Sequence, residues 1–396
     1  MKTNWKWAAC FCAACVMFTA CDDDNSDIIP PTDEYELTGT ISEDLTLEAG
    51  QNYTLSGGVH VTAGATLTIP AGVTITAVYD DVVDYILIEQ GAKIDAQGTA
   101  ENPIIMTSEH KEPTAWGGLH ICGYAHTNVQ GGTGSSEIGD ATYGGENDAD
   151  NSGILRYIRL EYTGYAFDEE HESNGISFYG VGNGTTVDHC QVYMGADDGF
   201  EFFGGSVNVK YLVATDCEDD SFDWTEGWNG KGQFLVATQS DGSEGDCLME
   251  CDNNGTNAEL TPIAHPILAN VTLIGNNGDA QGVRLRAGTQ VELYNALISG
   301  KALPLTVETT QTENYLADGT SKLEYVSLSG EVDSENGIYT NSMFAAATGN
   351  LTNQTLPNSY VGTTAGGETI SDSFFDVANY RGAVTEDNDW TEGWTL

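Results

Sequence analysis

Carboxylates recur at a fixed spacing in the middle of the chain. Residues 187–205 read VDHCQVYMGADDGFEFFGG and residues 209–227 read VKYLVATDCEDDSFDWTEG, so the second segment repeats the first 22 residues later. The ungapped alignment pairs Asp197 with Asp219, Asp198 with Asp220, and Glu201 with Asp223. Carboxylates are the ligands that Ca²⁺ prefers, and carboxylate pairs act as acid and base in glycoside hydrolysis. Either chemistry requires a fold that brings the two copies together.

The aspartate pairs form a candidate Ca²⁺ site, and no other cofactor is expected. Asp197, Asp198, Asp219 and Asp220 would offer hard oxygen donors from two neighbouring repeats to an ion that takes six to eight of them. Alternatively, these side chains accept hydrogen bonds from backbone amides in the turns, as aspartates commonly do. The spacing matches no EF-hand loop, so the two interpretations stay open.

A column of outward-facing residues, one in each repeat, is expected beside these aspartates. It contains His120, Ser177, Glu201, Asp223, Glu250, Arg284 and Thr306, with one extra residue allowed before Glu250. Two acids about 5 Å apart would repel by roughly 3 kcal/mol at an effective dielectric of about 20. A bound cation, a shared proton with a raised pKa, or Arg284 together with Arg286 would offset this repulsion.

The column gives the candidate residues for either catalysis or ligand binding. If the chain is an enzyme, its catalytic candidates are Glu201, Asp223, Glu250 and Arg284. If it is a binding protein, the same four residues and Trp228 would contact the ligand, because Trp228 follows a turn and should expose a ring for stacking on a sugar. The paired aspartates and Gly-His-Gly of polygalacturonases are absent, and few bases lie near the acids. Catalysis therefore stays open, and binding is favoured.

The repeat itself predicts the elements that carry this column. About 22 residues, built from short alternating strands and Gly, Asp and Asn turns, are typical of a parallel β-helix, a solenoid that stacks equivalent residues. We expect this solenoid over residues 37–330. Alternate residues of each strand point inward, which places Ile158, Cys190, Leu212, Val271 and Val326 in one core stack.

Two segments depart from the repeat. Residues 124–153 are rich in Gly, Asn and Asp, and we expect a long functional loop that projects from the coil. Residues 331–396 lose the rhythm, and we expect an irregular C-terminal cap packed on the β-helix, with a short helix at residues 342–347.

The N-terminus predicts export and a lipid anchor. Residues 1–21 combine a short basic start with an apolar stretch too short to span a bilayer, and they end in a lipobox-like sequence at Cys21, the expected lipidation site. Residues 22–36 are acidic and should form a flexible tether. The expected location is the outer membrane, exposed at the cell surface and attached through the lipid alone.

Charge and cysteine content restrict the partners. The chain has 60 acidic and 13 basic residues, a formal net charge of −47, which excludes nucleic acid and anionic membrane surfaces and disfavours polyanionic glycans unless a metal ion mediates. Beyond Cys21 the number of cysteines is odd, so at least one is expected to be unpaired, and the absence of C-x-x-C pairs argues against a zinc or redox site. These cysteines are Cys122, Cys190, Cys217, Cys247 and Cys251.

Several blocks of the sequence resemble a bacterial family. They are GTAENPII at residues 98–105, WGG at 116–118, GADDGFEFFGG at 195–205 and the Trp-x-x-Gly-Trp ending. The chain thereby resembles the surface β-helical proteins of Bacteroidetes that are often misnamed "multidrug transporter". The resemblance implies a secreted or surface-anchored right-handed β-helix and no established activity.

Taken together, these observations predict an all-β, right-handed parallel β-helix with a C-terminal capping region. The expected function is non-catalytic binding of a glycan or an extracellular protein partner. A carbohydrate-active enzyme, either a polysaccharide lyase or a glycoside hydrolase that uses the acidic column, is the first alternative. A structural or adhesive surface protein is the second.

Overall fold

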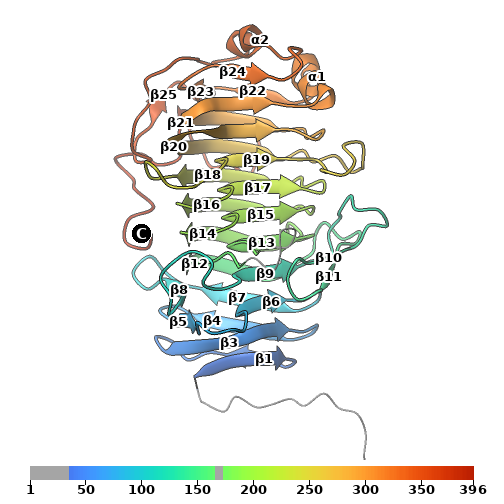
Figure 1. The fold of residues 1–396 in the computed structure, drawn as a ribbon, viewed down its shortest axis with the longest axis vertical. Coiled ribbons are helices and arrows are strands. Elements are labelled where there is room, and N and C mark those ends of the chain that lie inside the picture. Colours follow the sequence, from blue (N-terminus) through green and yellow to red (C-terminus); the bar gives the residue numbers. More distant parts are fainter. Residues whose placement is uncertain (1–34, 166–172) are drawn as a thin grey trace, which may run out of the picture.

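A computed structural model describes residues 35–165 and 173–396, and these residues form a parallel β-helix (Figure 1). One sheet of 22 strands contains the stacked coils, and every pairing within it is parallel. The right-handed crossover that parallel strands require gives the coil its hand. The predicted fold class is therefore confirmed. The signal, Cys21 and nearly all of the tether lie outside the described residues.

Each coil contributes strands to three faces. Face A carries the predicted column. Its strands are the ends of β1 (Glu36–Ile41) and β3 (Asn52–Val61), β6 (Tyr85–Ile88), β9 (Leu119–Cys122), β13 (Ile176–Tyr179), β15 (Phe200–Phe203), β17 (Phe222–Thr225), β19 (Met249–Cys251), the ends of β20 (Ile267–Leu285) and β21 (Glu292–Val307), and β24 (Val332–Ser334).

Faces B and C share long strands that bend at the corner between them. Face B begins with β2 (Leu45–Thr46), β4 (Thr66–Pro70) and β7 (Lys93–Gln97). Face C begins with the first residues of β1 and β3, followed by β5 (Thr74–Ala77) and β8 (Ile104–Ser108). Both then continue through β12 (Gly153–Glu161), β14 (Thr186–Tyr193), β16 (Asn208–Thr215), β18 (Lys231–Thr238), β20 and β21. Face B ends at β22 (Lys322–Glu324) and face C at β23 (Ser327–Leu328).

The core is a set of stacked apolar side chains, as the alternation predicts. Ile158, Cys190 and Leu212 lie in register on successive coils and are fully buried. Val271 and Val326 are also fully buried. The five cysteines of the described residues are buried free thiols. Burial of this core stack stabilises the rod, because each coil covers the apolar side chains of the next.

The bend between faces B and C has a backbone conformation that the alternation did not predict. Tyr157, His189, Tyr211 and Phe234 occupy this corner on successive coils with φ angles of 50° to 61°. A positive φ is uncommon for residues other than glycine. Here the four rings stack, with centroids 4.2 to 4.9 Å apart, so the aromatic contacts help to hold the strained corner.

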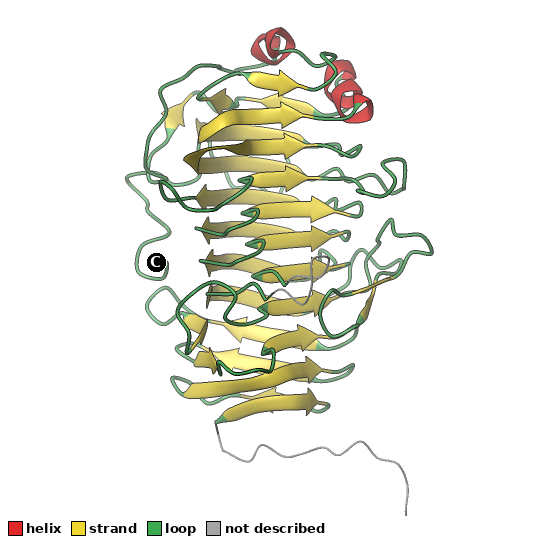
Figure 2. Cartoon of the chain, in the orientation of Figure 1, coloured by secondary structure: helices red, strands yellow, loops and turns green. Residues whose placement is uncertain are grey.

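The tail has two parts. Two short helices, α1 (Thr310–Asp318) and α2 (Asn341–Ala346), lie at the C-terminal end of the rod (Figure 2), and α2 confirms the helix predicted near residues 342–347. The chain then returns along the flank of the coil (Figure 1), where β25 (Thr364–Ala365) pairs with β26 (Tyr380–Arg381). Trp394 is fully buried there against Tyr157, and this return along the flank was not predicted. Neither α1 nor α2, the helices of the described residues, is long and apolar enough to cross a membrane.

Candidate functional site

The predicted column exists on the outer side of face A. His120, Ser177, Glu201, Asp223, Glu250, Arg284 and Thr306 are direct partners on successive strands. The register includes the extra residue allowed before Glu250. Three carboxylates from distant parts of the sequence are therefore neighbours, as the repeat requires.

The acids around this column form one acidic cluster across three coils. It consists of Asp197, Asp198, Glu201, Asp219, Asp220, Asp223, Asp246 and Glu250. Carboxylate oxygens of Asp198, Glu201 and Asp223 all lie within 4.8 Å of one another. Asp197, Asp198 and Asp219 form a second such group. The four predicted metal-site aspartates therefore belong to overlapping groups, and Asp246, from a longer turn, was missed.

The column faces out from the coil as predicted, but the centre of the cluster is buried. Asp198, Glu201 and Asp220 are 6%, 9% and 5% exposed. Burial is the main cause that raises the pKa of Glu201 well above its usual range, and the Glu137 and Asp223 carboxylates raise it further. Burial likewise raises the pKa of Asp223, where Asp220 and Glu250 add to the effect.

Two aspartates also bond to the backbone, as the turn-capping interpretation predicts. Asp198 Oδ1 accepts a hydrogen bond of 3.0 Å from the Asp220 amide, and Asp220 Oδ1 accepts one of 2.7 Å from the Cys247 amide. Each bond reaches the next coil, so these side chains also tie coils together. Because each bond uses one oxygen, a second carboxylate oxygen remains for a metal ion.

Glu201 and Asp223 differ in their hydrogen bonding. Glu201 Oε2 accepts a 2.6 Å bond from Asn174 Nδ2. Asp223 Oδ1 is buried and has no hydrogen-bond partner among the described residues. A buried carboxylate oxygen without a donor is costly, so this atom is the one most in need of a cation or a proton.

The arginines neutralise only one end of the column. Arg284 and Arg286 lie 2.8 and 2.7 Å from Glu250, and they also pair with Glu308 and Asp252. Burial nevertheless raises the pKa of Glu250, although both arginines lower it. Within residues 35–165 and 173–396, Glu201 and Asp223 form no ion pair. The arginines therefore leave the middle of the acidic cluster uncompensated.

Residues 124–153 leave the coil as the predicted long loop, and part of this loop packs on the outer side of face A. The loop contains the short hairpin of β10 (Gly134–Ser135) and β11 (Thr142–Tyr143). Tyr143 packs with Leu87, Tyr179 and Phe203 of face A in a small apolar cluster. Its hydroxyl donates a 2.8 Å bond to Glu226, and Glu137 accepts a 2.9 Å bond from Tyr179. These apolar and polar contacts hold the loop against the sheet.

Trp228 is not the exposed sugar platform that its position after a turn suggested. It is 1% exposed, and its ring stacks on Phe202 at a centroid distance of 4.2 Å. The preceding Gly227 has a φ of 86°, which turns the chain so that the indole enters the core. Its Nε1 donates a 3.2 Å bond to the Val207 carbonyl. Trp228 is therefore a core residue.

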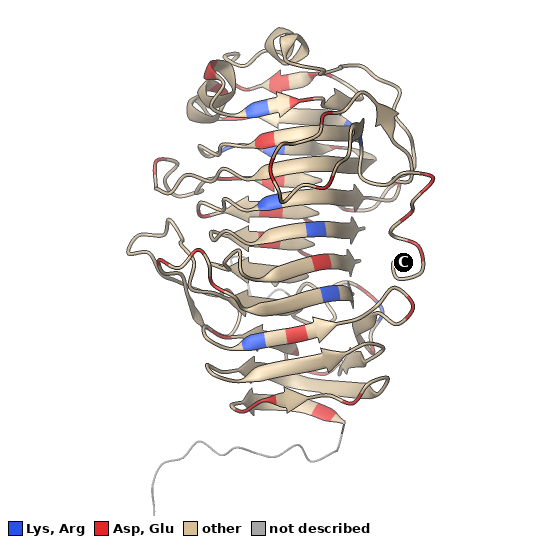
Figure 3. Ribbon diagram, turned by 180° about the vertical axis from the view of Figure 1, so that it is seen from behind, with Lys and Arg blue, Asp and Glu red and all other residues tan. Residues whose placement is uncertain are grey.

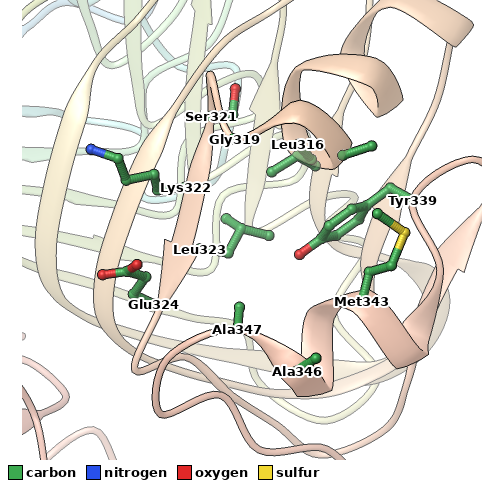
Figure 4. A pocket seen from close by; sticks show the side chains of 11 residues that line it. Leu316, Gly319, Ser321, Lys322, Leu323, Glu324, Tyr339, Met343, Ala346 and Ala347 are labelled. Atoms are coloured by element: carbon green, nitrogen blue, oxygen red, sulfur yellow. The ribbon is translucent and has the colours of Figure 1, made fainter.

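The remainder of the surface offers no comparable acidic group among the described residues. From behind, single basic and acidic residues are scattered over the strands (Figure 3), and several of them pair, as Arg156 does with Asp188 at 2.8 Å. A cavity of about 370 Å³ lies between α1 and α2 (Figure 4), where Leu316, Leu323 and Met343 make the lining largely apolar. Among the described residues, face A therefore carries the candidate metal site.

The fold and its acidic face define a parallel β-helix that carries a cluster of carboxylates on one side. The family model described as "Pectate-lyase like beta helix domain" matches residues 39–395, so the chain belongs to this family. No curated protein and no solved structure matches the chain significantly.

Proposed function

We propose that this chain is a non-catalytic glycan-binding protein whose acidic cluster holds Ca²⁺. The observation that carries the proposal is the group of Asp198, Glu201 and Asp223, with oxygens within 4.8 Å of one another and with Asp223 Oδ1 buried without a donor from residues 35–165 or 173–396. Ca²⁺ takes oxygen ligands at about 2.3–2.6 Å, so two ligands of one ion lie within about 5 Å of each other. The donor set fits this ion.

The bound ion would also provide the means of holding an acidic sugar. A net charge of −47 repels polyanions, so a uronate needs a bridging cation to approach this face. Asp197 and Asp246 are more exposed than the centre of the cluster and form its rim. A sugar carboxylate that reaches an ion at this rim would complete its coordination.

Calorimetric titration with CaCl₂ tests the ion site. We expect the variant Asp223→Asn to bind Ca²⁺ at least tenfold more weakly than the unaltered protein, because it loses the negative charge of a carboxylate at the centre of the cluster. Asp333→Asn is the matched control, since Asp333 lies at the exposed end of the same column, outside the acidic cluster. Equal Ca²⁺ affinity in all three proteins would refute the site.

Titration with oligogalacturonate tests whether the bound ion mediates binding of an acidic sugar chain. We expect the protein to bind oligogalacturonate in CaCl₂ and to lose this binding in chelator. The variant Asp223→Asn should bind oligogalacturonate more weakly in CaCl₂, as it binds Ca²⁺ more weakly. Binding that is unchanged by chelator would show that the acidic cluster does not mediate it.

Catalysis is the second candidate, and one observation favours it. Glu201 and Asp223 are adjacent acids with raised pKa values, an arrangement in which one acid can hold a proton while the other stays ionised. An enzyme would release reducing ends or unsaturated uronates from pectins or other polysaccharides, and Glu201→Gln would abolish that release. Our proposal expects neither product.

We further propose that Cys21 carries a lipid that anchors the chain at the outer membrane, on the cell surface. The basic start, the apolar stretch and the acidic residues after Cys21 support this location. Cys21→Ala should abolish incorporation of labelled palmitate and release the protein from the membrane fraction. Protease treatment of intact cells would then report the side on which it is displayed.

A further inference from the structure

A cavity of about 760 Å³ lies between the end of face C and the returning tail. Its lining shares no residue with the acidic cluster, although Gln239 donates a 3.3 Å bond to the Asp246 carbonyl at the rim of that cluster. Its volume is within the range of about 300–1,000 Å³ that small-ligand pockets occupy. The lining is made mainly of hydroxyl and amide side chains: Gln239, Ser240, Asn277, Ser299, Ser329 and Asn358.

The floor of this cavity follows the repeat of the coil. Thr238, Ile274 and Ser299 are direct partners on successive strands, and all three line it. Neighbouring strands are about 4.8 Å apart, which is close to the length of one sugar unit in a linear chain. Polar groups on successive coils can therefore meet successive sugar units.

The wall opposite the floor is a segment of the tail, residues 356–360. Backbone hydrogen bonds fix it at both ends, from the Gln354 amide to the Leu328 carbonyl and from the Gly362 amide to the Val384 carbonyl, each 2.9 Å long. Tyr360 closes the segment and is partly buried, so its ring has a fixed place at the cavity wall. A wall anchored in this way lowers the ordering cost of binding.

The charge of the lining restricts the ligand. No Lys or Arg is among the described residues that line the cavity, so it offers nothing to neutralise an anion. Its acid, Asp241, accepts a 2.6 Å bond from Asn277 Nδ2. Neutral donors and acceptors beside a tyrosine ring match a hydroxylated, uncharged ligand.

We propose that this cavity binds a neutral oligosaccharide, independently of Ca²⁺ and of the acidic cluster. The proposal shares with the proposed function only the view that the chain binds glycans, and it uses different residues. The two sites would then recognise an uncharged and an acidic stretch of polysaccharide separately.

The experiment is calorimetric titration in chelator with four neutral probes: cellohexaose, xylohexaose, mannohexaose and maltohexaose. At least one should bind, and Tyr360→Ala and Asn358→Ala should each weaken that binding at least tenfold. Asn358 is exposed, so its replacement should leave the melting temperature unchanged. The control is Thr355→Ala, an exposed position just outside the lining, which should bind as the unaltered protein does.

Two results would overturn the proposal. One is that none of the four probes binds at millimolar concentration. The other is that a probe binds but both cavity variants bind it as tightly as the control does. The chelator keeps this test separate from the test of the proposed function. If the acidic cluster holds no Ca²⁺, the Ca²⁺-dependent binding of oligogalacturonate is absent, whereas the binding of neutral sugars in chelator is unaffected.

Discussion

The protein also buries a carboxyl group outside the acidic cluster, that of Asp84. Asp84 is 2% exposed, its Oδ1 accepts a 2.5 Å bond from the Gly57 amide, and its Oδ2 has no partner among the described residues. Burial raises the pKa of Asp84 to about 7, although the bond from Gly57 opposes the increase. The folded protein therefore binds a proton here that the unfolded chain releases near pH 4.

The sign of the pH dependence follows from this difference. A carboxyl with a raised pKa stabilises the fold below about pH 4, and this contribution is lost as the pH rises towards about 7. Asp84→Asn keeps an acceptor for Gly57 and removes the charge. We expect it to stabilise the protein by about 1–3 kcal/mol at pH 8 and by little at pH 4. Urea unfolding at both pH values measures this, and an equal effect at both would contradict the assignment.

At the scale of elements, the tail and the corner of the coil depend on each other. Trp394 lies edge-on to Tyr157, with ring centroids 5.6 Å apart, and belongs to an apolar cluster with Val213 and Val236. The terminal Leu396 amide donates a 2.9 Å bond to Gln191 Oε1. The tail therefore covers the side of the rod as well as its end.

Replacing Trp394 tests whether the contact between the tail and the corner of the coil stabilises the protein. We expect Trp394→Ala to destabilise the protein by about 3–5 kcal/mol, because it removes a fully buried side chain and leaves a cavity. Val377→Ala is the control in the same tail, since Val377 is 84% exposed and should change stability by less than about 0.5 kcal/mol. Similar denaturation midpoints for both variants would mean that the tail does not stabilise the coil.

The elements also show what the sequence could predict. The register of Glu201 with Asp223 was predictable, because two copies of equal length must stack when a coil closes. The cover over face A was not, because Tyr143 meets Glu226 across 83 residues with no periodic signal. Trp228 was misplaced because the sequence alone does not show that Gly227 turns the ring inward.

For the whole molecule, the stacking that builds the core also concentrates negative charge. Equivalent acids of successive coils must lie about 4.8 Å apart. Burial and mutual repulsion raise the pKa values of Asp198, Asp220 and Asp223 well above their usual range. Without a cation the fold is therefore expected to lose stability as the pH rises above the ordinary carboxyl range.

Calcium should reverse that loss. At 100 times its dissociation constant, a ligand specific for the folded state adds about 2.7 kcal/mol. We expect CaCl₂ to raise the melting temperature by several degrees at pH 7.5 and by less at pH 5, where protons compete for the same oxygens. Calorimetric scans with CaCl₂ or chelator measure this, with MgCl₂ as the control. Melting temperatures that are indifferent to Ca²⁺ at pH 7.5 would argue against a structural ion.

The most direct measurement is diffraction from crystals of this protein soaked in a lanthanide that replaces Ca²⁺. The account predicts an anomalous peak within bonding distance of Asp223 Oδ1 and of at least one oxygen from Asp198 or Glu201. Well-ordered carboxylates in that position with no peak between them would contradict it.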